Sequence, residues 1–559
     1  MDFGSEIVDA VRGYEYVSLD VYDTLLVRPY VHPTDVFRHI EVRENAPGFR
    51  EERIAAEKRC MASPYPTTFD RIYEEIPERY KHLKEKELLY ESNAVCPEKI
   101  LKTYREILKD HRVVMVSDMY LPQEFIENLL KKNGIDGYEK FYLSSVTGTS
   151  KGKGNMFDYV AADLKIEKSQ IIHVGDNIKT DFLNPKKNGF NAILTEKPVN
   201  SHFKRNKGVG KFYKKDRSLE RSILVGMDTI RAFSGKDEGF WKEVSYRFGG
   251  PLVFDYAKFV ADRLRDDDVV MLAARDGYNI ERILNILRPD VRTHYLYVPR
   301  ILNVLIGSSF SQHYGYKKTI VRYFYGDVEN PERFYDDNLE EIESKRKALL
   351  DSYRAKIVSE TGEPKMISCV DVTSMKYSAQ RLISDLFPDS DVLGHYYYVL
   401  HDNRNVPHTA YHVRTRMLKL VDNININEFF MTSPEPPITG IDHNGNPVFR
   451  EPCREEQDRL DIYGDVTAGE LDYAHDIVKM FGDRMIPLSF DVLHHWMVVL
   501  ILGSGSETRS RLASIKWAVN ADHTEYVSMV YHPRDTFFHA RRTINDLAWF
   551  IVARLRGER

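Results

Sequence analysis

The sequence predicts an α/β protein built on two Rossmann-like parallel sheets. In the first two hundred residues, short apolar runs at 16–20 (YVSLD), 113–118 (VVMVSD) and 171–176 (IIHVGD) alternate with amphipathic helical patterns. This alternation is typical of parallel strands connected by helices. A second series of strand, polar turn and helix begins after residue 222, and the C-terminal part reads as mostly helical. A chain of 559 residues also exceeds the size of one hydrophobic core, which predicts several domains.

Composition and charge narrow the classes of function. The formal net charge is −5, so the chain has no overall positive charge that would attract nucleic acid or an acidic membrane surface. The four cysteines are widely spaced and form no CxxC pair, which fits a reducing compartment. The most apolar stretch, at 494–505, is too short to cross a bilayer and is expected to be a buried element. We therefore predict a cytoplasmic protein with no membrane span and no nucleic-acid partner.

The order of these patterns predicts four regions. A first α/β domain covers 1–196 and contains a helical insert at about 32–97. Residues 197–221 are rich in Lys, Gly and Asn, and they are predicted to be a solvated basic linker. A second Rossmann-like domain is expected over 222–425. A loop and a mostly helical region, 426–559, are expected to pack on this second domain.

Polar residues follow the predicted strands of the first domain. Because the carboxyl ends of parallel strands face one crevice, these side chains are expected to lie together. The residues concerned are Asp20, Ser117, Lys151, Asp176 and Asp181. A carboxylate can attack phosphorus, a hydroxyl and an ammonium can hold phosphate oxygens, and further carboxylates can hold a hard cation such as Mg²⁺. The pattern therefore predicts a site for phosphoryl chemistry.

In order and spacing, these residues resemble the four motifs of the haloacid dehalogenase (HAD) superfamily. The resemblance implies that Asp20 is the nucleophile and that Ser117 and Lys151 hold the phosphate. Lys153 is the alternative to Lys151, but the spacing from Lys151 to Gly154 matches the family pattern better.

The same resemblance implies a Mg²⁺ site. Asp20, Asp176 and Asp181 would be its carboxylate ligands, and the backbone carbonyl of Tyr22 would complete the protein's share of the coordination. The helical insert occupies the place of the superfamily's type I cap, a lid that closes over the substrate. Asp118 lies beside the site in the sequence and is interpreted as a turn cap.

Tyr22 departs from the pattern of HAD phosphatases. These enzymes usually carry a second aspartate two residues after the nucleophile, and such a general acid and base is worth about 10²–10⁴-fold in rate. Three alternatives follow from the tyrosine. The protein is a slow phosphatase helped by Asp23, a phosphotransferase whose phospho-aspartate waits for an acceptor, or a pseudoenzyme that keeps the fold for binding.

In the second half, four polar residues follow predicted strands: Arg275, Asp276, Arg300 and Asp371. Two guanidinium groups with carboxylates in one crevice would suit a phosphorylated or sugar-nucleotide ligand. The alternative is that these residues form buried ion pairs that fix strand-to-helix turns.

Several short motifs are similar to those of long two-domain HAD-like proteins, which are often encoded among surface-polysaccharide genes. These motifs are DVYDTLLVRP, SDMYLP, AARDGY and EFFMTSP. The predicted function is a Mg²⁺-dependent phosphohydrolase or phosphotransferase that acts on a small phosphorylated metabolite, in surface-glycan or sugar-phosphate metabolism. One alternative is a catalytically weak binding or scaffold protein that works with a glycosyltransferase or other glycan-biosynthesis enzymes. Another alternative makes the second domain a transferase that uses a phosphorylated sugar donor.

Overall fold

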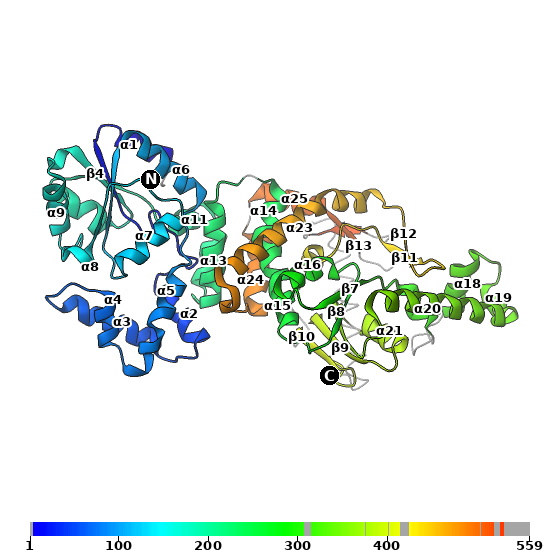
Figure 1. Ribbon diagram of the computed structural model, residues 1–559. Coiled ribbons are helices and arrows are strands. Elements are labelled where there is room, and N and C mark those ends of the chain that lie inside the picture. Colours follow the sequence, from blue (N-terminus) through cyan, green and yellow to red (C-terminus); the bar gives the residue numbers. More distant parts are fainter. Residues whose placement is uncertain are drawn as a thin grey trace. The chain divides into compact units, whose positions relative to one another are not determined.

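The computed structural model describes residues 4–236, 238–306, 315–374, 376–400, 402–413, 424–503, 505–518 and 526–529 (Figure 1). The chain divides into two compact units, each of which is described by itself. Unit 1 comprises Met1–Asp237 with Met480–Ile486, and unit 2 comprises Glu238–Lys479 with Pro487–Arg559. Both units are α/β, as the alternation of strand and helix patterns predicts.

Unit 1 is built on a parallel sheet of five strands in the order β3-β2-β1-β4-β5. The strands are β1 (Tyr16–Leu19), β2 (Arg112–Ser117), β3 (Lys140–Leu143), β4 (Ile171–Gly175) and β5 (Asn191–Leu194). Every residue of β1 and β4 is buried, as expected for central strands of a parallel sheet. The chain order reverses between β1 and β4, whose pairing runs from Tyr16 with Ile171 to Leu19 with Val174. Such a reversal opens a crevice at the carboxyl ends of the two strands.

The connecting helices of unit 1 include α1 (Ser5–Val11), α6 (Glu98–Asp110), α7 (Gln123–Lys132) and α9 (Asn155–Leu164). Apolar residues at three- and four-residue spacing give each longer helix one face that packs on the sheet. In α9, Met156, Phe157 and Val160 form a buried cluster with Val114 and Val116 of β2. This packing holds the loop before α9 at the carboxyl edge of the sheet.

A helical insert lies between β1 and β2, as predicted for residues 32–97. It contains α2 (Asp35–Arg43), α3 (Phe49–Ala62), α4 (Phe69–Glu75), the 3₁₀ helix η1 (Glu78–Leu83) and α5 (Lys84–Glu91). Figure 1 shows it as a group of blue helices beside the sheet. The entering and leaving segments are tied by two backbone hydrogen bonds between Val27 and Val95, of 2.8 and 2.9 Å.

A fully buried ion pair lies in the middle of the insert. Nε and Nη2 of Arg53 each donate to Glu87 at 2.7 Å. The Arg53 guanidinium also stacks on the rings of Phe37 and Tyr120, with its central carbon 4.6 Å from each ring centre. All terminal nitrogens of Arg53 are used, because Nη1 donates to Glu57.

The prediction of a linker at 197–221 is wrong, because these residues form helices of unit 1. They are α11 (Pro198–Arg205), α12 (Lys207–Lys214) and the start of α13 (Leu219–Ala232). Val209, Phe212 and Tyr213 are buried, while the lysines among and beside them stay in solvent. The basic composition therefore describes only the outer face of an amphipathic segment. At Gly226 of α13 a Cβ atom would overlap the backbone of Pro29 and Tyr30, so the helix lies directly against the segment that leads into the insert.

Unit 2 contains a second parallel sheet, with the strand order β10-β9-β8-β6-β7. The strands are β6 (Val269–Ala273), β7 (Arg292–Leu296), β8 (Met366–Ser374), β9 (Asp391–Val399) and β10 (His408–Val413). This confirms the second Rossmann-like region. The chain order reverses between β6 and β8, which places a crevice at their carboxyl ends.

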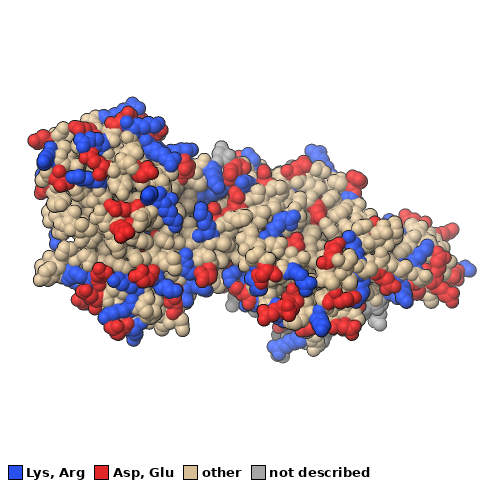
Figure 2. Space-filling model, viewed as in Figure 1, with Lys and Arg blue, Asp and Glu red and all other residues tan. Residues whose placement is uncertain are grey.

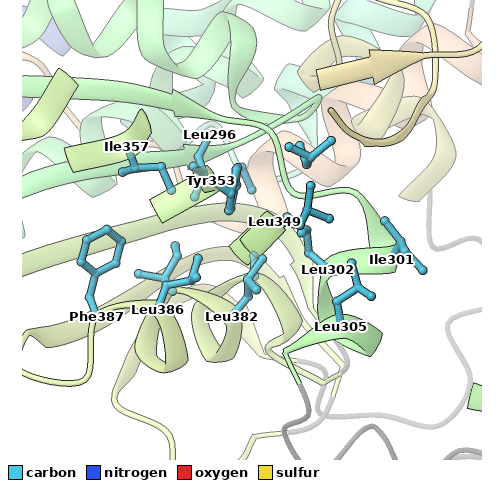
Figure 3. Packing of buried hydrophobic residues seen from close by; sticks show 14 of the residues in the cluster. Leu296, Ile301, Leu302, Leu305, Leu349, Tyr353, Ile357, Leu382, Leu386 and Phe387 are labelled. Carbon is cyan, nitrogen blue, oxygen red and sulfur yellow. The ribbon is translucent and has the colours of Figure 1, made fainter. Parts of the chain in front are cut away.

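Helices pack on this sheet around one apolar core. They include α15 (Gly250–Ala261), α16 (Gly277–Leu287), α17 (Arg300–Leu305), α18 (Tyr316–Tyr325), α19 (Pro331–Asp337), α20 (Leu339–Thr361) and α21 (Ser378–Leu386). Leu296 of β7, Leu302 of α17, Leu349 of α20 and Leu382 of α21 belong to one buried cluster (Figure 3). Four separate elements thus share the same core.

The C-terminal region is mostly helical, as predicted. It contains α22 (Ile424–Met431), α23 (Arg454–Phe481), α24 (Phe490–Leu502) and α25 (Ser506–Ser514), with short strands β11 (Ile438–Ile441), β12 (Pro447–Phe449), β13 (Lys516–Ala518) and β14 (Tyr526–Ser528). The apolar stretch predicted to be buried is α24, where Trp496 is fully buried and donates to the carbonyl of Arg247 at 2.7 Å. Among the described residues, no helix combines the length and the apolar character needed to cross a membrane.

The face of the molecule in Figure 2 carries interspersed positive and negative side chains. Lys and Arg alternate with Asp and Glu over this face and form no extended surface of one sign. The distribution agrees with the small net charge of −5.

Gly226→Ala tests the packing of α13 into unit 1. The added methyl group would meet backbone atoms rather than a flexible side chain, so we expect a loss of about 1–3 kcal/mol in the free energy of unfolding. Urea unfolding of both proteins measures this loss. Gly13→Ala is the matched control, because nothing lies within 4 Å of a Cβ at that position. Equal losses in the two variants would contradict the packing.

Candidate functional site

The predicted residues of unit 1 come together at the carboxyl edge of its sheet. Asp20 follows β1, Ser117 ends β2 and Asp176 follows β4, while Asp181 lies in a π-helical turn, η3 (Ile178–Leu183). The carboxylates of Asp20, Asp176 and Asp181 offer oxygens that all lie within 4.8 Å of one another. Convergence of three carboxylates from separate segments is what the strand-end pattern predicts.

Lys151 joins two of these carboxylates. Its Nζ lies 2.5 Å from Oδ1 of Asp20 and 2.6 Å from Oδ1 of Asp181, and its side chain is 3% exposed. Lys153 is exposed, so the choice of Lys151 over Lys153 agrees with the geometry. The backbone N–H of Lys151 donates to Asp118 at 2.8 Å, which confirms Asp118 as a turn cap.

Further contacts fix the loop that carries Lys151 and the turn that carries Asp181. Nδ2 of Asn184 donates to the carbonyl of Lys151 at 2.7 Å. Oδ2 of Asp181 accepts the N–H of Asn177 at 2.9 Å. A Cβ at Gly175 would lie 2.6 Å from Cγ of Asp181, so the glycine that ends β4 leaves room for this carboxylate. The Asn184 side chain therefore fixes the backbone at Lys151, and a backbone N–H fixes the carboxylate of Asp181.

Crowding of buried charges shifts the pKa values of these groups. Burial raises the pKa of the Asp20 carboxyl to about 8, against the attraction of Lys151 and with the repulsion of Asp181 and Asp176. Burial, helped by the charge of Asp23, also raises the pKa of Asp176 although Lys197 opposes the shift. Burial opposes ionisation of Asp181, but Lys151 and His173 hold the pKa of Asp181 well below its usual range. The site therefore holds more acid than its ammonium groups can neutralise.

The donor set fits Mg²⁺. Carboxylate oxygens are the hard ligands that Mg²⁺ prefers, and a divalent cation would offset the excess negative charge. Asp20, Asp176 and Asp181 supply three such oxygens close to one another. The carbonyl oxygen of Tyr22 accepts no backbone hydrogen bond from the described residues, which leaves it available as the fourth protein ligand.

Three supporting residues at this site were missed from the sequence. The Thr24 hydroxyl lies 3.3 Å from Oδ2 of Asp20 and 3.3 Å from Oδ1 of Asp176. Nζ of Lys197 contacts Oδ2 of Asp176 at 3.2 Å. Nε2 of His173 lies 3.2 Å from Oδ1 of Asp181. Thr24 and His173 stand inside the quoted strand-end motifs, whereas Lys197 was assigned to the linker.

Tyr22 and Asp23, the two residues considered for proton transfer, both contact other side chains. The Tyr22 hydroxyl is buried without a hydrogen-bond partner among the described residues, and burial raises the pKa of Tyr22 far above its usual value. Its ring lies under the guanidinium of Arg28, whose carbon is 4.1 Å from the ring centre. Asp23 pairs with Nζ of Lys197 at 2.8 Å. Neither side chain is therefore placed as a ready proton donor.

A cavity of about 670 Å³ opens between the sheet edge and the helical insert of unit 1. At the sheet end it is lined by Asp20, Ser117 and Lys151, and at the insert end by Phe37 and Tyr65. This volume suits a small metabolite.

No protein-family model matches the sequence, and no curated protein is significantly similar to it. Several solved structures resemble about a third of the chain. An uncharacterized protein from Listeria monocytogenes serotype 4b has 17% identity over 31% of this chain and 74% of that one, with a TM-score of 0.19. A dehalogenase with an intermediate complex has 14% identity over 32% and 84%, with a TM-score of 0.26. A haloacid dehalogenase-like family hydrolase from Xanthomonas campestris has 14% identity over 33% and 82%, with a TM-score of 0.27. TM-scores this low do not assign a function to unit 1.

The predicted residues of unit 2 come together only in part. Asp276 lies just after β6, and Asp371 lies within the last part of β8. Burial, with the charges of Glu428 and Asp371, raises the pKa of Asp276 well above its usual range. Burial likewise raises the pKa of Asp371 to about 6. Nη1 of Arg275 contacts Oε2 of Glu456 at 3.5 Å.

The expected pair of Arg275 with Arg300 is not formed. Arg300 is exposed at the start of α17 and makes no hydrogen bond or ion pair with a described residue. The second arginine beside Arg275 is instead Arg459 of α23, which also contacts Glu456, at 3.1 Å. Because Arg275 and Arg459 share one buried carboxylate, these contacts favour the buried ion-pair alternative at this position.

Cation binding at the three carboxylates should release protons. Burial raises the pKa of Asp20 to about 8, so any proton that this carboxyl holds at lower pH must leave when Mg²⁺ binds. Affinity for Mg²⁺ is therefore expected to rise with pH up to about 8 and to level off above it. Titration calorimetry in buffers of different ionisation enthalpy measures the released protons.

Asp20→Asn is the control for this release, since it removes the proton that is displaced. Asp176→Asn should weaken Mg²⁺ binding but leave the ionisation of Asp20 in place. Equal affinity and no proton release near pH 6 and near pH 9 would contradict the site.

Proposed function

We propose that unit 1 is a Mg²⁺-dependent, HAD-like phosphohydrolase or phosphotransferase that acts through a phospho-aspartate on a small phosphorylated metabolite. The observation that carries the proposal is the contact of one buried ammonium, on Lys151, with two members of a carboxylate triad. A site of this kind can accept a phosphoryl group beside a carboxylate nucleophile.

Each residue takes one role in the proposed reaction. An oxygen of Asp20 attacks phosphorus, the bond from phosphorus to the leaving oxygen breaks, and an aspartyl phosphate forms. Ser117 and Lys151 hold the phosphoryl oxygens. Water, or an acceptor hydroxyl, then attacks phosphorus and returns Asp20 to its carboxylate form. Mg²⁺, held by Asp20, Asp176, Asp181 and the Tyr22 carbonyl, would neutralise the negative charge shared by nucleophile and phosphate.

The proposed reaction has no well-placed side chain for proton transfer. The leaving oxygen needs a proton, and the water or acceptor must lose one, yet Tyr22 is buried with a strongly raised pKa. We therefore expect slow turnover, because general acid–base help is worth about 10²–10⁴-fold. The same feature favours the second candidate, a binding or scaffold protein with little turnover, which works with a glycosyltransferase or other glycan-biosynthesis enzymes.

The pathway and the second unit complete the proposal. The similarity of several sequence motifs to proteins encoded among surface-polysaccharide genes supports a role in surface-glycan or sugar-phosphate metabolism, in the cytoplasm. In unit 2, the acids Asp276 and Asp371 stand at a strand reversal with Arg275 nearby. This crevice is the place where a phosphorylated sugar donor would bind if unit 2 is a transferase.

Asp20→Asn should abolish Mg²⁺-dependent turnover of generic phosphoesters, because an amide oxygen cannot form the aspartyl phosphate. A steady-state assay across a phosphate-ester library measures this loss, with the melting temperature as the check that the variant is folded. Equal rates for variant and native protein would remove Asp20 as nucleophile. Absence of turnover in both would favour the binding or scaffold protein.

Tyr22→Asp should raise phosphatase turnover by about 10-fold or more, since it supplies the missing acid and base. The new carboxylate also lies beside Arg28, which can stabilise its ionised form. Tyr22→Phe is the matched control: it removes a hydroxyl that has no partner, so neither turnover nor stability should fall. A folded Tyr22→Asp variant with unchanged turnover would show that the site does not lack acid–base chemistry.

A further inference from the structure

Arg28 carries hydrogen-bond donors that no described residue satisfies. Its side chain is 6% exposed, and Nε donates to Oε2 of Glu91 at 2.9 Å. One face of the guanidinium is covered by the Tyr22 ring. Within the described part of the chain, Nη1 and Nη2 make no hydrogen bond, although a guanidinium can donate from all of its N–H groups. The outer edge of Arg28 thus has no partner in the described protein, and because neither Nη atom is fully enclosed, this edge is accessible to a molecule in a cavity.

Arg53, a buried arginine of the helical insert, differs from Arg28 in its hydrogen bonds. Arg53 is also buried, but Nε, Nη1 and Nη2 all donate to carboxylates of Glu87 and Glu57. Buried donors in folded proteins nearly always have partners, because leaving one unsatisfied is unfavourable. The free edge of Arg28, on a side chain that is otherwise buried, is therefore available to hydrogen-bond acceptors of a bound ligand.

The position of Arg28 indicates which ligand this is. Arg28 lines the cavity of about 670 Å³ that also holds Asp20 and Lys151. A smaller cavity of about 380 Å³ is lined by Arg28 and Arg217. Tyr22, which stacks on the guanidinium, and Glu91, which binds Nε, line the larger cavity and not the smaller one. The environment of the guanidinium is thus that of the larger cavity.

We propose that Arg28 forms a second anion-binding subsite in this cavity. The ligand is a small phosphorylated compound with a further anionic group, a carboxylate or a second phosphate, which accepts hydrogen bonds from Nη1 and Nη2. Glu91 anchors Nε and Tyr22 fixes the plane, so the outer edge can bind an oxyanion with two parallel bonds. The inference rests on the proposed function for the phosphoryl end, which lies at Asp20 and Lys151.

Ligand binding at Arg28 is expected to depend on the planar shape of the guanidinium more than on its charge. Glu91 already neutralises its formal charge, so the subsite acts through directed hydrogen bonds rather than through net attraction. Lysine would keep the charge but lose the planar fork, and it is not an adequate replacement. Selectivity of the cavity for a second anionic group is therefore expected to depend on arginine itself.

Binding to the Asp20→Asn protein with Mg²⁺ tests the subsite without turnover. Titration calorimetry compares glycerol 3-phosphate, which has one anionic group, with 3-phosphoglycerate and propane-1,3-diyl bisphosphate, which have two. We expect at least one of the latter two to bind about 10- to 100-fold more tightly than glycerol 3-phosphate, as for hydrogen bonds to charged groups. Preference for one of them distinguishes a carboxylate from a second phosphate.

Arg28→Met and Arg28→Lys, each added to Asp20→Asn, should remove most of this preference. Arg217→Met is the matched control, because Arg217 lines only the smaller cavity. If Arg28→Met does not fold, since it leaves Glu91 buried without a partner, Arg28→Met with Glu91→Leu removes both charges and takes its place. The preference should survive in the Arg217 variant alone.

Three results would overturn the subsite: equal binding of the three compounds, a preference that persists without Arg28, or one that disappears with Arg217→Met. Binding of none of the compounds at millimolar concentration would overturn it too. The proposed function fails separately. A preference that depends on Arg28, together with no phosphoester turnover by the native protein, would keep the subsite and favour the binding protein.

Discussion

The double ion pair of Lys151 is the interaction on which the site of unit 1 depends. Three carboxylates with oxygens within 4.8 Å of one another would repel each other or take up protons in a buried environment. One ammonium, at 2.5 Å from Asp20 and 2.6 Å from Asp181, keeps two of them together. The removal of one partner from such a buried pair typically lowers the free energy of unfolding by about 3–5 kcal/mol, because it leaves the other charge buried and uncompensated. A cation at the remaining oxygens would complete the neutralisation.

The surroundings of Lys151 divide the cavity into two ends with different chemistry. At the sheet end, Asp118 caps the loop of Lys151, and His173 supports Asp181. Hydrogen bonds of this kind can hold reactive groups in one geometry. At the insert end, the ring of Tyr22 lies under the guanidinium of Arg28. The sheet end thus holds acids around one ammonium, whereas the insert end holds a guanidinium stacked on an aromatic ring.

Those parts of the site that follow directly from strand ends could be predicted from the sequence. Asp20 and Asp176 each end a buried apolar run, and parallel strands must bring such ends together. Contacts made across the fold could not be predicted in this way. Lys197 reaches Asp23 across 174 positions of the chain, and the basic composition around it indicated a linker because composition does not show which face of a helix is buried. In unit 2, the strand-end rule located Asp276 but not the direction of Arg300, and the partner of Arg275 came from a distant helix instead.

Trapping of the aspartyl phosphate tests the central claim most directly. The native protein is incubated with Mg²⁺ and acetyl phosphate, quenched, and reduced with borohydride, which converts an aspartyl phosphate to homoserine. Peptide mass spectrometry then locates the changed residue. The account predicts homoserine at position 20, formed only with Mg²⁺ and in lower yield when Lys151 is replaced by methionine. Unmodified Asp20 alongside measurable phosphoester turnover, or homoserine at another aspartate, would contradict it.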